Sequence, residues 1–187
     1  MTAGDGTTFP PPGIDGVRGR RPALAVFSVT SLAILVVDLV TKQLVVAHLE
    51  GRQPVRLLGG AVYLVAIRNS GAAWSIGRSF TVIFPILAIG AVCWIGWMTL
   101  RLRSVPWAVA LGLVLGGVCG NLTDRLFRAP GPFQGHVVDF ISVFDDGGRV
   151  FPVFNAADSA LSIGLCLILV LELTGRHRDG TRIRKQA

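Results

Sequence analysis

Two aspartates, Asp139 and Asp158, are the residues of this sequence whose type and surroundings best suit acid–base chemistry. Neither has a lysine or arginine within four positions along the chain. Two carboxyl groups that share one proton can act as general base and general acid, because closely held like charges push their pKa values apart. Such a pair could activate water against a peptide bond and protonate the leaving amine. The same carboxyl groups would suit an ion- or proton-coupled transport site equally well.

Two further groups of polar residues have helical spacing. Asp38 and Lys42 are four positions apart and can pair on one helix face, which is more typical of a structural pair than of a catalytic one. Asn121, Asp124 and Arg125 also share a face, so Arg125 can neutralise Asp124 or reach a carboxylate on a neighbouring helix. A network that positions loops explains this second group as well as direct chemistry does. Asn155 stands three positions before Asp158, on the same face.

Other catalytic arrangements are not evident in the sequence. No serine–lysine or serine–histidine arrangement is recognisable, and the three histidines lack metal-ligand spacing. The three cysteines lie inside apolar blocks without a CxxC motif, and we interpret them as small buried hydrophobic residues; they are Cys93, Cys119 and Cys166.

The elements that position these residues follow from composition. The chain of 187 residues is 51% hydrophobic and only 16% charged, whereas soluble domains carry about 25% charged residues. Its apolar residues collect in four blocks, at 23–47, 80–100, 104–123 and 154–171. A helix of about 20 apolar residues spans a bilayer. The sequence therefore predicts an all-α membrane fold of four transmembrane helices.

Short β-like runs lie between the apolar blocks. Residues 54–68 contain two such runs split by a glycine pair, and we expect them to form a small sheet with the stretch near Val137. This sheet would make an extracytoplasmic cradle in the outer loops. Asp145 and Asp146 predict a polar turn between two extended segments. Small residues and Trp74 follow Asn69 just before the second block.

The basic residues predict the orientation. Ten lysines and arginines lie in the two tails and in the turn near residue 102, and six are spread over the loops at about 48–79 and 126–153. By the positive-inside rule both termini are cytoplasmic, and the polar ends of all four spans meet near the outer face. The net charge of +7 then favours lipid headgroups over nucleic acid as a partner. The predicted organisation is a disordered cytoplasmic tail (1–22), a membrane domain (23–174) and a basic cytoplasmic tail (175–187).

Five stretches, in this order, resemble one family, the bacterial lipoprotein signal peptidases (signal peptidase II). They are DLVTK (38–42), NSGAAW (69–74), GGVCGNLTDR (116–125), GHVVDF (135–140) and FPVFNAADS (151–159). The resemblance covers roughly residues 25–173. Trp74 stands where the family usually has phenylalanine, and Val118 occupies a small-residue position. These two departures affect packing and substrate fit near the first loop and the third block.

The resemblance implies a membrane-embedded aspartyl endopeptidase of the bacterial cytoplasmic membrane. Such enzymes cleave signal peptides from prolipoproteins just before a diacylglyceryl-modified cysteine, near the extracytoplasmic face and without metal or organic cofactor. The family's catalytic pair falls on Asp139 and Asp158. Its supporting residues fall on Asp38, Lys42, Asn69, Asn121, Asp124, Arg125 and Asn155. The expected partners are the lipidated precursor and membrane lipids, with no nucleic acid, and the enzyme is expected to act as a monomer.

Two readings from other classes remain. A small proton- or cation-coupled transporter would use the intramembrane aspartates as a relay, although no internal repeat supports it. A non-catalytic membrane scaffold would leave many costly polar groups in one layer without a purpose.

Overall fold

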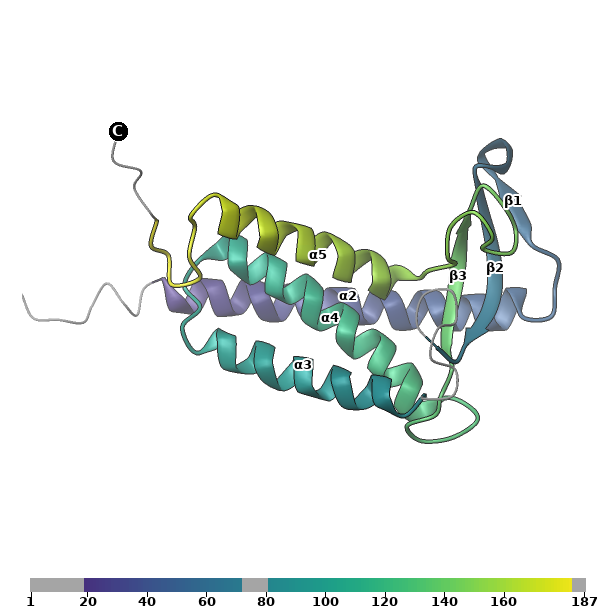
Figure 1. The fold of residues 1–187 in the computed structure, drawn as a ribbon, viewed down its shortest axis with the longest axis horizontal. Coiled ribbons are helices and arrows are strands. Elements are labelled where there is room, and N and C mark those ends of the chain that lie inside the picture. Colours follow the sequence, from purple (N-terminus) through teal and green to yellow (C-terminus); the bar gives the residue numbers. More distant parts are fainter. Residues whose placement is uncertain (1–18, 72–80, 183–187) are drawn as a thin grey trace, which may run out of the picture.

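The computed structural model describes residues 19–71 and 81–182 and shows a helical bundle with a small sheet at one end (Figure 1). The described helices run side by side, and the strands lie across one end of the bundle. The helices are α2 (Arg20–Leu49), α3 (Ile83–Thr99), α4 (Val105–Phe127) and α5 (Ala156–Leu173). The strands are β1 (Val55–Leu57), β2 (Val62–Asn69) and β3 (Val137–Val143), with a short 3-10 turn, η1 (Leu58–Gly60), between β1 and β2. A mostly helical fold with a small sheet is therefore confirmed.

The helices extend beyond several of the predicted blocks. Helix α2 begins at Arg20, inside the segment predicted to be a disordered tail, and α4 continues to Phe127. Helices α2, α4 and α5 are long and apolar enough to cross a membrane. Helix α3 is apolar but only 17 residues long. Length and composition thus support three of the four predicted spans.

Helix α4 is the central element of the bundle and packs against α2, α3 and α5. Its glycines allow close approach: a Cβ at Gly116 would lie 2.7 Å from Cβ of Ile34 on α2. On α5, a Cβ at Gly164 would lie 2.7 Å from a methyl group of Val114. Small residues at such crossings let helix backbones pack closely in membranes. The close packing brings the polar side chains of α2, α4 and α5 within reach of one another.

The β-like runs and the stretch near Val137 form a sheet, as predicted, and its strands are antiparallel in the order β1-β2-β3. Val138 and Phe140 of β3 form a hydrophobic cluster with Val45 of α2, which fastens the sheet to the end of that helix. The register pairs Asp139 with Ile67 of β2. Asp139 is thereby held on the central part of a buried strand, with 3% of its surface exposed.

The opposite end of the bundle holds the start of α2 and the end of α5 (Figure 1). There the backbone carbonyl of Arg176 accepts a hydrogen bond from the buried Trp107 indole, 2.7 Å away. The prediction that all three cysteines are buried was wrong: Cys93 and Cys166 are exposed on the apolar outer surfaces of their helices, and Cys119 is half-buried. Trp74 and residues 1–18 of the predicted tail lie outside the described residues.

Candidate active site

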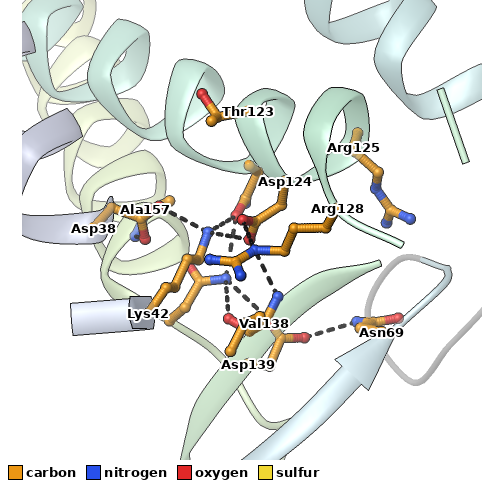
Figure 2. A network of polar contacts seen from close by, with 12 residues as sticks. Asp38, Lys42, Asn69, Thr123, Asp124, Arg125, Arg128, Val138, Asp139 and Ala157 are labelled. Atoms are coloured by element: carbon orange, nitrogen blue, oxygen red, sulfur yellow. Dashed lines mark hydrogen bonds and ion pairs between the residues drawn. The ribbon is translucent and has the colours of Figure 1, made fainter. Parts of the chain in front are cut away.

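A buried lysine connects three helical side chains where the bundle meets the sheet. Lys42 is fully buried, and its ammonium lies 2.7 Å from Oδ2 of Asp38 and 3.0 Å from Oδ2 of Asp124. It also donates a hydrogen bond of 2.9 Å to Oδ1 of Asn121. The ammonium group therefore lies among three oxygen atoms, two of them from carboxylates. The predicted Asp38–Lys42 pair is confirmed, and Figure 2 shows the lysine between the two carboxylates.

The same network joins the helices to the strand that carries Asp139. The second oxygen of Asp38 accepts a 2.9 Å hydrogen bond from the backbone N–H of Ala157, in the first turn of α5. Asp124 accepts a 3.2 Å bond from the backbone N–H of Val138. Asp124 also pairs with Arg128, so two cations balance two buried carboxylates. Removing one partner of such a group would leave a buried charge uncompensated.

Of the roles predicted for Arg125, the pairing with a carboxylate was wrong, whereas its contacts fit a network that positions loops. Its guanidinium makes no ion pair with a carboxylate among the described residues; it donates instead to backbone carbonyls of Ser70 and Gly71, after β2, and of Gly135, before β3. It also lies 5.1 Å from the ring centre of Phe84, at the start of α3. In Figure 2 Arg125 points away from the cluster around Asp124. Arg125 therefore fastens the segments that flank the site.

Two asparagine amides hold the Asp139 carboxyl group. Nδ2 of Asn155 donates to Oδ1 of Asp139 at 2.8 Å, and Nδ2 of Asn69 donates to Oδ2 at 2.8 Å. Figure 2 shows Asn69 reaching this carboxyl group from the end of β2. Asp139 is thus oriented by residues from β2 and from the start of α5.

Asp158 is held by the N-terminal cap of α5. Asn155 is the N-cap, and its side chain accepts a 2.9 Å bond from the backbone N–H of Asp158. In return, Oδ2 of Asp158 accepts a 3.1 Å bond from the backbone N–H of Asn155, which completes a capping box. Oδ1 of Asp158 accepts a 2.8 Å bond from Asn121. Asn155 therefore contacts both aspartates.

The two aspartates line one cavity of about 670 Å³. Apolar side chains make up most of its wall, including Phe84, Phe151 and Ile163. Burial, followed by the neighbouring negative charge of Asp158, raises the pKa of Asp139 to about 7, although the amide hydrogen bonds act in the opposite direction. Asp139 can therefore gain or lose a proton near neutral pH. A cavity with a few convergent polar groups and a perturbed pKa has the properties of a catalytic site.

The structure also shows contacts that sequence reasoning missed. Arg128 lies four positions after Asp124, a spacing that predicts a helical ion pair. Asn155 and Asp158 have the spacing of a capping box at a helix start.

Asp145 forms the predicted turn by accepting four backbone N–H bonds from residues 147–150. Within residues 19–71 and 81–182, no group of His, Cys, Asp or Glu is suited to hold a metal ion.

These features define a helical membrane protein with a paired-carboxyl cavity where the bundle meets a small sheet. Residues 30–174 match the family model described as signal peptidase (SPase) II. A lipoprotein signal peptidase of Streptomyces griseus is 48% identical over 176 residues, covering 94% of this chain and 87% of that protein. A lipoprotein signal peptidase of Mycobacterium avium is 43% identical and covers 95% of each chain. The chain belongs to the signal peptidase II family.

Solved structures agree with this assignment. One bacterial membrane enzyme superposes with a TM-score of 0.70 at 26% identity, covering 88% of this chain and 94% of that one. A second superposes with a TM-score of 0.69 at 28% identity, covering 80% and 94%. Family membership makes the chain a bacterial membrane peptidase and leaves the transporter reading without support.

Proposed function

We propose that this peptidase is an aspartic endopeptidase that removes signal peptides from prolipoproteins, just before a diacylglyceryl-modified cysteine. Asp139 and Asp158 form the catalytic pair. The observation that carries the proposal is that both carboxyl groups line one cavity and share an asparagine partner, Asn155. The similar lipoprotein signal peptidases support the substrate class.

In the proposed mechanism the aspartates have different protonation states. We assign the shared proton to Asp139, whose pKa is raised to about 7, and the role of general base to Asp158. Asp158 takes a proton from a water molecule, and the oxygen of this water adds to the scissile carbonyl carbon. The acid proton of Asp139 stabilises the developing oxyanion and then passes to the leaving amine as the C–N bond breaks. These steps use no metal or organic cofactor.

The supporting residues act through the aspartates. Asn69, Asn121 and Asn155 fix the orientation of the two carboxyl groups through the amide bonds described above. Lys42 orients Asn121, because its ammonium donates to the amide oxygen and leaves the NH₂ group to face Asp158. Asp38 and Asp124 balance the charge of Lys42, and the remaining predicted residue, Arg125, holds the segments on either side of the cavity.

We further propose that all four helices cross the membrane. Helix α3 is about 26 Å long at 1.5 Å per residue, close to the roughly 30 Å of a hydrocarbon core, and it packs along α4. Both termini then lie in the cytoplasm and the sheet lies at the extracytoplasmic face, as the distribution of basic residues indicates. A lipid-anchored precursor enters the cavity laterally, and the enzyme acts as a monomer in contact with membrane lipids.

Cleavage of a diacylglyceryl-modified precursor by the purified chain, with no ion gradient, tests the proposal. The wild type should cleave it, and Asp139→Asn and Asp158→Asn should each abolish turnover while remaining membrane-inserted. Asp146→Asn is the control, because Asp146 is an exposed carboxylate that does not line the cavity. Substantial cleavage by either dyad variant would overturn the catalytic assignment.

A further inference from the structure

Three large apolar side chains gather at one end of the small sheet and face solvent. Leu57, Leu58 and Phe144 are 39%, 80% and 66% exposed. We call these three residues the sheet tip. Leu58 begins the turn between β1 and β2, and Phe144 directly follows β3. Ala61 connects them: its N–H donates to the carbonyl of Leu58, and its own carbonyl accepts from the N–H of Phe144.

The backbone holds two of these side chains in an unfavourable conformation. Leu58 has φ 47° and Phe144 has φ 66°, in the left-handed region that bulky residues rarely adopt. Gly59 and Gly60, which follow Leu58, also have positive φ, but glycine has no Cβ and adopts this conformation without strain. Glycine or asparagine would relieve the strain at positions 58 and 144 and would also suit water better than leucine and phenylalanine. Strain combined with apolar exposure points to a function for these side chains.

The position of the sheet along α2 places the tip at a membrane surface. The exposed apolar side chains of α2 extend from Val29 to Leu44 and mark its lipid-facing belt. The sheet packs against the next residues, Val45, Val46 and Leu49. It therefore begins where the belt ends. Because the strands run across the helices, the end of the sheet that carries β1 projects sideways beyond α5 (Figure 1).

Two observations favour lipid over other occupants. None of the three tip residues is among the residues that line the cavity beside the two aspartates, so the tip lies outside the proposed catalytic pocket. Arg56, which precedes Leu57, packs under the turn and donates to the carbonyl of Gly59 at 2.6 Å. It pairs with no carboxylate among the described residues. A cation beside an apolar tip is complementary to an anionic headgroup above acyl chains.

We propose that the sheet tip is a membrane anchor: Leu57, Leu58 and Phe144 insert into the boundary between headgroups and acyl chains of the leaflet at the sheet end. The anchor holds the sheet against the bilayer surface beside the helix bundle. This inference concerns a lipid surface and is tested without measuring peptidase activity, so its failure would leave the proposed function intact.

A fluorescent label at the tip tests the anchor. The full chain, with its three cysteines replaced by alanine, carries Leu58→Cys or Phe144→Cys labelled with an environment-sensitive dye, in nanodiscs of phosphatidylethanolamine and phosphatidylglycerol. Gln53→Cys is the matched control, because Gln53 is exposed in the loop before β1. We expect lipids with a nitroxide near the acyl carbonyl to quench the tip labels several-fold more than the control, and aqueous iodide to quench them several-fold less.

Each other outcome would overturn the proposal. Equal iodide quenching at the tip and at residue 53 would show that the tip lies in water. Shielding that appears only after addition of a lipidated precursor would assign the tip to substrate. Shielding that persists in detergent, with self-quenching that grows with protein concentration, would assign it to a second copy of the chain. The two tip positions report independently, so misfolding of one variant leaves the test valid.

Discussion

The effect of Asp139→Asn on the stability of the protein should change sign as pH rises. The variant should be less stable than the wild type in acid and more stable in alkali. Asp139 is 3% exposed, and burial together with the charge of Asp158 raises its pKa from 3.8 to about 7. At about 1.4 kcal/mol for each pKa unit, this shift corresponds to roughly 4 kcal/mol. Between these two pKa values the folded protein binds a proton that the unfolded chain releases. The free energy of unfolding of the wild type should therefore fall by about 4 kcal/mol from pH 4 to pH 7 and then level off.

The asparagine variant lacks this titration but loses one acceptor. Both oxygens of Asp139 accept amide N–H groups, from Asn155 and Asn69, so the new NH₂ group must face one of these donors. One unsatisfied buried donor costs about 1–3 kcal/mol at every pH. Relative to the wild type, Asp139→Asn should thus be less stable near pH 4 and more stable, by roughly 1–3 kcal/mol, above pH 7.

Thermal unfolding of both proteins in one detergent, followed by tryptophan fluorescence across this pH range, measures the effect. The difference between the two melting temperatures should change sign between acid and alkaline pH. Asp146→Asn should show no such crossing, because Asp146 is exposed. A difference that does not vary with pH would refute the reasoning that Asp139 is held neutral by burial and by Asp158.

Two further predictions concern the framework around the cavity. Lys42→Met leaves Asp38 and Asp124 without the buried ammonium and should destabilise the protein by about 3–5 kcal/mol in thermal unfolding, whereas Val40→Met on the exposed face should have little effect. Equal melting temperatures would show that the lysine is dispensable. Asp145→Ala removes the acceptor of four backbone N–H groups, and hydrogen exchange at residues 147–150 should accelerate there but not in Asp146→Ala. Unchanged protection would mean that other contacts hold the turn.

Long apolar blocks predict helices well because their signal is local. The four blocks each become a helix, and the split β-like runs become β1 and β2. Helix ends are less predictable, because tertiary contacts extend them. Arg20 is charged and gave no apolar signal, yet α2 begins there. The number of spans also depends on the 17-residue length of α3, which composition alone did not give.

The site shows the same division between local and distant contacts. The Asp38–Lys42 pair was predictable because residues four apart share a helix face. The pairing of Asp124 with Arg125 was wrong, since adjacent helical residues point in different directions. Arg128, four positions on, makes the contact instead. The carbonyl groups that Arg125 binds follow β2 and precede β3, and no spacing rule brings these segments together.

Asn155 makes both a contact that sequence spacing predicts and contacts with residues far away in the sequence. As N-cap, it must lie three positions before Asp158 to satisfy the first turn of α5. Its side-chain oxygen is occupied by that role, which leaves its NH₂ group free to reach Asp139 on β3 and the amide oxygen of Asn121 on α4. The capping geometry thus fixes the position of one carboxyl group relative to the other. Loss of the Asn155 side chain would remove both the cap of α5 and a hydrogen bond to Asp139, so helix stability and the geometry of the pair depend on the same residue.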